Sequence, residues 1–291
     1  MPIQHPSLYD AVYARMQSIR TNLSVGTWKG KNRVYRTAPT KYAGRIGADE
    51  YRKPWNSSAK DNRWTGPRPA PVTSSNPAAS GVYTSVGISD ALLGELTFYD
   101  PLLRANYCEA LGLRPGTELS PTLDEDVARE LADKKPKQRS LLTPQNFPAA
   151  LAARRIFEYE FPIALPIADL SLTSGRGREL LRNVSADACV RAELRKAGYR
   201  DATQAYLANF DNSLPRALSQ AIRDLRPEVS AIWVTSARAD EARAARDIEG
   251  DNIVFYGTDS TPIQALKPIQ EISFVPQPDG KLKELHGYFK L

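Results

Sequence analysis

Histidine and cysteine are scarce in this sequence, with two residues of each type, and that scarcity excludes several kinds of site. His5 and His286 lie near opposite ends of the chain, so a histidine-based catalytic triad or a multi-histidine metal site has almost no material. Cys108 and Cys189 are too few for a thiolate cluster, and no disulfide framework is expected. We therefore expect chemistry that uses Glu, Asp, Ser, Tyr and Arg, without a metal.

Long hydrophobic runs are also missing. No stretch is apolar enough to cross a bilayer, and the N-terminal residues lack the apolar core of a general secretory signal. We predict a cytoplasmic protein, or one that a specialised secretion system delivers into the cytoplasm of a target cell. The 291 residues are 42% hydrophobic and 25% charged, which is ordinary for a globular protein with a sizeable core.

Negative charge is scarce in the first quarter of the chain. Residues 1–70 contain 13 Lys and Arg but only 4 Asp and Glu, although the net charge of the whole chain is only +6. Aromatic residues are interleaved with these basic residues: Trp28, Tyr35, Tyr42, Trp55 and Trp64. Such a segment is compatible with nucleic-acid binding, with a site for a phosphorylated small molecule, or with a solvated face.

Strand and helix patterns alternate irregularly along the chain, which predicts an α+β fold rather than a doubly wound sheet. Predicted strands are Asn32–Thr37, Val82–Val86, Ser230–Thr235, Asn252–Tyr256 and Ile269–Val275, and Glu158–Leu170 also suits strand pairing. Predicted helices are Tyr9–Asn22, Pro148–Phe157, Arg178–Val184, Ala186–Ala197 and Thr203–Leu225, the last interrupted near Asn212 and Pro215. We predict an N-terminal helical extension over residues 1–26 and a domain over 27–291, with insertions near 39–80 and 106–160.

The segment Gly81–Leu96, GVYTSVGISDALLGEL, predicts a strand, a turn and a helix. Ser89 and Asp90 suit the N-cap and the first turn of that helix. Glu95 falls on the apolar stripe of the helix, where burial and partners would tune its charge and make it a candidate site residue. The alternative is a glutamate at the edge of the stripe that reaches water.

Two further motifs each allow two interpretations. The SGRG sequence at Ser174–Gly177 could open a helix whose N-terminus binds an anion, but a turn is the commoner use of such a sequence. Ser236 follows a predicted buried strand, so its hydroxyl could face a binding site, or it could cap a turn.

One glutamate, two arginines and an aromatic residue suit a dinucleotide whose glycosidic bond is cleaved. Guanidinium groups such as those of Arg36 and Arg63 can bind a diphosphate with two hydrogen bonds each. A ring such as that of Tyr83 can stack on nicotinamide, and a carboxylate such as that of Glu95 can stabilise positive charge on the ribose. Sequence spacing alone does not establish that these residues converge.

Taken in order, the segments VYR, RWTG, GVYTS, ALLGEL, DATQAYL, VTSAR and DNIVFY resemble the RES-domain family over roughly residues 32–257. That family includes NAD⁺-degrading toxins of toxin–antitoxin pairs and antibacterial effectors. The resemblance implies a split mixed β-sheet similar to diphtheria-type ADP-ribosyltransferases, with helices on the periphery. It also implies NAD⁺ as the substrate and no metal.

The resemblance implies a role for each matched residue. The catalytic residues that it implies are Arg36, Tyr83, Glu95 and Ser236, and the NAD⁺-binding residues are Arg36, Arg63, Trp64 and Tyr83. The sequence departs from the family where DNRWTG lacks a tight glycine turn and where Thr37 replaces a second aromatic residue. These departures affect the expected substrate geometry and the choice of acceptor.

We expect an NAD⁺ glycohydrolase or phosphorylase, with transfer of ADP-ribose to a protein as an alternative. From other classes, a nucleic-acid-binding module and a catalytically silent interaction protein stay open. Because an enzyme that drains NAD⁺ harms its host, we expect a cognate antitoxin or immunity protein that covers the site with an acidic surface. The segment Pro39–Ser80 suits either a lid over the dinucleotide or a static surface loop.

Overall fold

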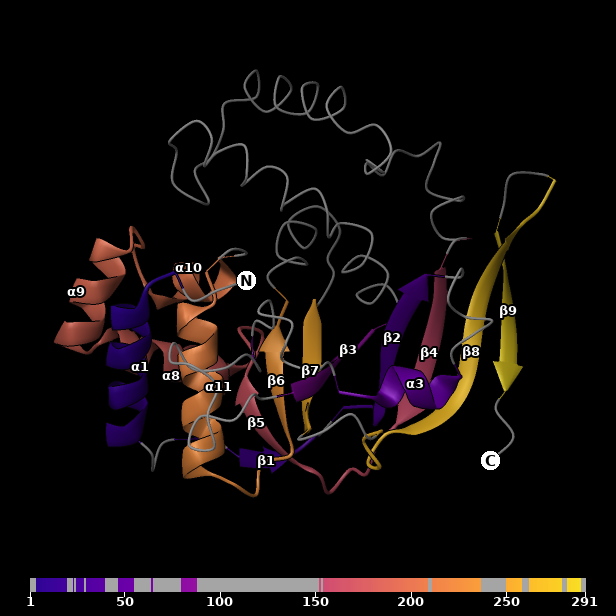
Figure 1. The fold of residues 1–291 in the computed structure, drawn as a ribbon, viewed down its shortest axis with the longest axis horizontal. Helices are drawn as coiled ribbons and strands as arrows, with labels where there is room; N and C mark the ends of the chain where they lie inside the picture. Colours follow the sequence, from indigo (N-terminus) through magenta and orange to yellow (C-terminus); the bar gives the residue numbers. More distant parts are fainter. Residues whose placement is uncertain are drawn as a thin grey trace, which may run out of the picture.

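The computed structural model describes residues 4–19, 23, 25–28, 30–39, 47–54, 64, 80–87, 152, 154–208, 211–236, 250–257, 262–278 and 282–288. These residues form an α+β fold around one mixed sheet (Figure 1). The order of strands across the sheet is β1-β5-β6-β7-β3-β2-β4-β8-β9. The strands are β1 (Val25–Thr27), β2 (Arg33–Pro39), β3 (Ser80–Ser85), β4 (Arg154–Glu160), β5 (Pro166–Leu170), β6 (Ala231–Thr235), β7 (Asp251–Gly257), β8 (Lys267–Pro276) and β9 (Leu282–Tyr288).

The helices gather at one end of the sheet because most of them connect two neighbouring strands there. Strands β5 and β6 are parallel, and a parallel pair needs a crossover connection. That crossover contains α8 (Gly175–Ser185), α9 (Ala188–Lys196), α10 (Ala202–Leu207) and α11 (Ser213–Leu225). The other described helices are α1 (Pro6–Ser18) and α3 (Ala48–Arg52).

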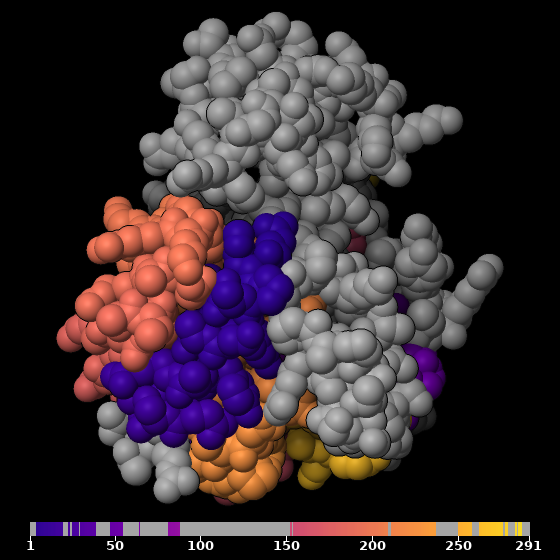
Figure 2. Space-filling model, turned by 60° about the vertical axis from the view of Figure 1, so that its left-hand side comes forward, coloured from indigo at the N-terminus to yellow at the C-terminus, as the bar shows by residue number. Residues whose placement is uncertain are grey.

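One large core lies between this helical layer and one face of the sheet. Apolar residues of α8–α11 pack there against Ala168, Leu170, Ile232, Val234 and Val254. Helix α1 contributes Leu8, Val12 and Met16 to the same core, and it lies on the surface between α9 and α11 (Figure 2). Strand β1 pairs with β5, so α1 belongs to the core and β1 belongs to the sheet.

A second core lies on the opposite face of the sheet. It includes Val34, Val82, Phe157, Tyr159 and Phe255, which come from four different strands. Helix α3 covers part of this face, since the Tyr51 ring stacks on Phe157 with a centroid distance of 4.3 Å. Both faces are therefore buried in the middle of the sheet, which explains the nearly continuous apolar runs of β6 and β7.

The sheet is interrupted between β2 and β3. These strands pair at a single register position, Tyr35↔Ser85, whereas β2 and β4 pair along all seven residues of each strand. Past that position, toward Pro39 on β2 and Ser80 on β3, no further pairing joins the two described strands. We call this feature the β2–β3 divergence. It divides the sheet into a half that carries the helical layer and a half formed by β2, β4, β8 and β9.

The structure confirms most of the predicted elements that lie within the described residues, and it corrects one of them. Residues Arg154–Phe157, predicted as the end of a helix, form most of β4 because they pair with strands on both sides. The interruption predicted near Asn212 is confirmed, since α10 ends at Leu207 and α11 begins at Ser213. Pro215 lies in the first turn of α11, where its missing N–H costs no bond. Strands β1 and β9 and helix α3 were not predicted, and the polar sequence of β9 reads as a loop until β8 offers it an edge.

Among the described helices, none is both long and apolar enough to span a membrane. The predicted helix that follows β3, and most of the two predicted insertions, lie outside the described residues.

Candidate functional site

Arg36 lies in the middle of β2, beside the β2–β3 divergence. Its Nη1 donates hydrogen bonds to the main-chain carbonyls of Tyr51 and Lys53, the latter at 3.3 Å. The side chain therefore ties β2 to the C-terminal end of α3. Val34 and Ala38, two residues to either side, are buried in the second core, so Arg36 projects from the same face of the sheet.

Tyr83 lies on β3, on the other side of the divergence, and it organises the tryptophan of the RWTG motif. Its hydroxyl accepts a hydrogen bond of 2.8 Å from the main-chain N–H of Trp64. The Tyr83 ring is partly buried against the core of the helical layer. The Trp64 residue is 3% exposed and belongs to that core.

A chain of contacts leads from Trp64 to the end of β6. The Trp64 ring meets the Tyr206 ring edge to face, with 5.2 Å between centroids. The Tyr206 hydroxyl accepts from the main-chain N–H of Thr235 at 2.9 Å and donates to the carbonyl of Leu170 at 2.9 Å. The RWTG, VYTS, DATQAYL and VTSAR motifs, distant in sequence, are thus joined by direct contacts between Tyr83, Trp64, Tyr206 and Thr235.

Ser236 is the residue that follows β6, where these contacts end. Its main-chain N–H donates a 2.7 Å hydrogen bond to the carbonyl of Gly250, just before β7. The residue is partly buried. Its backbone is therefore held at the C-terminal end of β6, next to the start of β7.

A buried carboxylate, which sequence reasoning missed, accepts hydrogen bonds from several residues near the C-terminal end of β6. Asp251 is 3% exposed, and its two oxygens accept four hydrogen bonds. The donors are Ser171 Oγ (3.0 Å), Thr173 Oγ1 (2.6 Å), Trp233 Nε1 (3.0 Å) and Thr235 Oγ1 (3.0 Å). Burial raises the pKa of Asp251, and the four hydrogen bonds oppose that rise. The available signal in the sequence was an aspartate directly before the apolar strand Asn252–Tyr256.

The SGRG motif starts helix α8, so the structure favours the helix over the simple turn. Ser174 is the N-cap, and its hydroxyl accepts from the N–H of Gly177 at 2.8 Å. The same hydroxyl donates to Asp169 at 2.7 Å. Burial is the main cause that raises the pKa of Asp169. Within the described residues, Ser174 thus caps α8. It belongs to the same β5–α8 connection as Ser171 and Thr173, which donate to Asp251.

The structure brings some of the predicted site residues together and separates others. Tyr83 and Trp64 are in contact, and both connect through Tyr206 to the β6 end that carries Ser236. Arg36 and Tyr83 flank the same divergence from opposite faces, because Tyr35 pairs with Ser85 and side chains alternate along each strand. Arg63 and Glu95 lie outside the described residues.

Most described basic side chains of the first quarter have contacts within the protein. Arg33 forms an ion pair with the buried Glu158 at 2.7 Å. Arg52 pairs with Asp49, and Lys53 pairs with Glu50. Arg15 donates to the carbonyl of Asn183. These four basic side chains therefore have structural partners within the described part of the protein.

Within the described part of the chain, His, Cys, Asp and Glu side chains nowhere gather in a group of three or more that could hold a metal ion. Comparison with known proteins found no protein-family model that matches the chain and no curated protein that matches it.

The raised pKa of Asp251 predicts a pH dependence of stability. Between the ordinary pKa of an aspartate and the higher pKa of Asp251 in the folded protein, the folded state binds more protons than the unfolded state. The free energy of unfolding therefore falls as the pH rises through this interval. We expect Asp251→Asn, measured by urea unfolding at a series of pH values, to flatten this fall. Asp10→Asn, which removes an exposed carboxylate, is the control. Equal pH dependence in Asp251→Asn and wild type would contradict the prediction.

Proposed function

We propose that this chain is an NAD⁺-consuming enzyme of the RES type, which cleaves the bond between nicotinamide and ribose. The observation that carries the proposal is the contact chain Tyr83–Trp64–Tyr206–Thr235. These residues come from four of the segments that carry the resemblance, and tertiary contacts join them around the end of β6. Unrelated surface motifs would have no reason to meet in this way.

The β2–β3 divergence supports the fold that the proposal implies. A mixed sheet that is interrupted between two strands is what a fold similar to diphtheria-type ADP-ribosyltransferases requires. Arg36 stands on one side of the divergence and Tyr83 on the other, facing opposite sides of the sheet. A dinucleotide that contacts both residues would therefore lie through the divergence, with its diphosphate near Arg36 and its nicotinamide near Tyr83.

The proposed reaction breaks the bond between ribose C1′ and the nicotinamide nitrogen. Nicotinamide leaves with the electron pair, and positive charge develops on the ribose. Glu95 stabilises that charge, while Arg36 and Arg63 hold the diphosphate and Tyr83 stacks on the nicotinamide ring. Water or phosphate then forms the new bond at C1′ and loses a proton, or a protein side chain takes its place. Ser236 contacts a phosphate or the acceptor, and Trp64, whose main-chain N–H is bound to Tyr83, belongs to the same NAD⁺-binding group.

A protective partner is part of this proposal. An active enzyme would drain NAD⁺ from the cell that makes it, so an antitoxin or immunity protein would have to cover the site. An acidic contact surface on that partner would complement the basic first quarter of the chain. Growth of a strain that expresses the active chain alone, with its NAD⁺ level unchanged, would contradict the need for such a partner.

Nicotinamide release from NAD⁺ by the purified protein tests the proposed function, with Tyr83 as the discriminating position. Tyr83→Phe keeps the ring and loses only the hydrogen bond from Trp64, so it should lower kcat/KM less than Tyr83→Leu, which removes the stacking surface and should lower kcat/KM about tenfold. Arg191→Lys, on the exposed side of α9, is the control for general effects of substitution. Absence of release by wild type, with and without phosphate or cell lysate, would overturn the proposal.

A further inference from the structure

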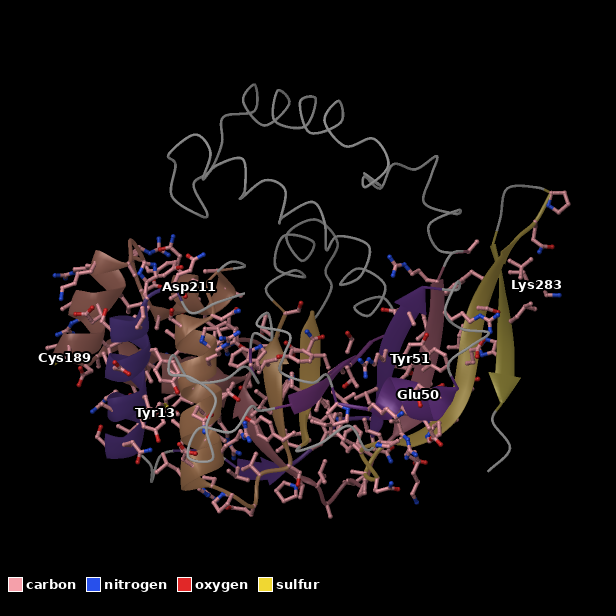
Figure 3. The ribbon with its side chains drawn as sticks, in the orientation of Figure 1. Tyr13, Glu50, Tyr51, Cys189, Asp211 and Lys283 are labelled. Atoms are coloured by element: carbon pink, nitrogen blue, oxygen red, sulfur yellow. The ribbon has the colours of Figure 1, made fainter. Side chains whose placement is uncertain are left out.

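A group of basic and phenolic side chains surrounds Arg36 beneath helix α3. Tyr51, labelled in Figure 3, stacks on Phe157 with an interplanar angle of 26°. In the sheet, Phe157 lies between Arg36 on β2 and Glu271 on β8. Arg155 precedes Phe157 by two residues and so projects from the same face. These side chains form what we call the α3 site, on the opposite face of the sheet from Tyr83.

Two hydrogen-bond donors in the α3 site, and a third beside it, are buried without a partner. The hydroxyl of Tyr51, the Nε of Arg155 and, on α3 itself, the Nε of Arg52 make no hydrogen bond to any described residue. Burial is the main cause that raises the pKa of Tyr51; the charge of Glu271 adds to the rise, and the charges of Arg36 and Arg155 oppose it. Native proteins rarely leave buried donors unsatisfied, and a ligand is one cause of such an exception.

The guanidinium of Arg155 is already oriented by one carboxylate. Its Nη1 donates to Glu271 Oε1, which holds the planar group in place. Nε lies on a different edge of that plane from Nη1. An arginine edge that includes Nε presents two parallel N–H groups, which match two oxygens of a tetrahedral oxyanion.

Charged side chains of both signs lie around α3. Asp49 pairs with Arg52, Glu50 pairs with Lys53 and Glu271 pairs with Arg155. Arg36 brings a further positive charge to this region, and its Nη1 donates to the carbonyls of Tyr51 and Lys53. The side chain of Arg155 is 32% exposed, although its Nε is buried.

We propose that Tyr51 and Arg155, together with Arg36, form a binding site for an oxyanion of the phosphate class. The site extends the proposed function, and rests on it only for the identity of the ligand. That ligand is either free inorganic phosphate or the diphosphate of a dinucleotide. Both present tetrahedral oxyanions to the same donors.

The test measures binding by calorimetry, with inorganic phosphate in one arm and ADP-ribose in the other. Tyr51→Phe removes only the unsatisfied hydroxyl, and Arg155→Lys keeps the charge but removes the Nε edge. We expect each variant to weaken binding about tenfold in the arm that binds wild type. Tyr13→Phe and Arg191→Lys are the matched controls, because Tyr13 donates to Asp224 and Arg191 is exposed, both far from α3.

Thermal unfolding gives a second readout that a merely structural role would not produce. Without ligand, Tyr51→Phe should raise the unfolding midpoint, since an unsatisfied buried donor is removed. With ligand, the midpoint of wild type should rise more than that of either variant. Equal binding by wild type and both variants, or no binding in either arm, would overturn the proposal. Binding without nicotinamide release would leave the α3 site standing and overturn the proposed enzyme activity.

Discussion

Replacing Gly177 with alanine is expected to lower the free energy of unfolding by about 3 kcal/mol, because the new methyl group has no space. A Cβ at this position would lie 2.1 Å from the carbonyl oxygen and 2.7 Å from the nitrogen of Ser171. Both atoms belong to the backbone just after β5, so a side-chain rotation cannot relieve the clash. Helix α8 would have to move away from the sheet and from the Ser174 cap, and urea unfolding would report the loss.

Gly175→Ala is the matched control, since it adds the same methyl group two residues earlier in the same helix. A Cβ on Gly175 would have no atom within 4 Å. We expect this variant to be neutral or up to about 1 kcal/mol more stable, because alanine restricts the unfolded chain. If the free energies of unfolding of Gly177→Ala and Gly175→Ala differed by less than about 0.5 kcal/mol, the close approach of α8 to β5 would be contradicted.

The second large effect concerns catalysis. If the proposed function holds, Glu95→Gln should lower the kcat for nicotinamide release about 10²-fold. The amide keeps the size of the side chain but removes the negative charge that stabilises the developing ribose cation. The effect should appear in kcat more than in KM, because the charge is needed in the transition state rather than in the bound substrate.

Glu179→Gln, at an exposed position of α8, is the control for removing one carboxylate. Its rate should match wild type, and both variants should unfold at the wild-type temperature. A Glu95→Gln rate within about threefold of wild type would remove Glu95 from the mechanism, while the proposed NAD⁺ chemistry would then depend on another group.

The hydrogen bonds of Asp251, at the C-terminal end of β6, show why local sequence reasoning missed this residue. Its four donors come from the β5–α8 connection and from β6, and the residues that supply them are 16 to 80 positions away in the chain. A pattern read over a window of a dozen residues cannot contain such partners. Tyr51 and Arg155 were missed for the same reason, because α3 and β4 meet only through the second core.

What the sequence determined by itself is local: that most of these elements form, and which of their side chains share a face. The stripe on α1, the Ser174 sequence that opens α8 and the apolar runs of β6 and β7 all predicted their elements, because backbone periodicity is a property of neighbouring residues. Tertiary structure alone decided the order of the strands, the β2–β3 divergence and the placement of Arg36 and Tyr83 on opposite faces. The physical reason is that strand neighbours are chosen by burying both faces of the sheet at once, which depends on contacts between distant parts of the chain.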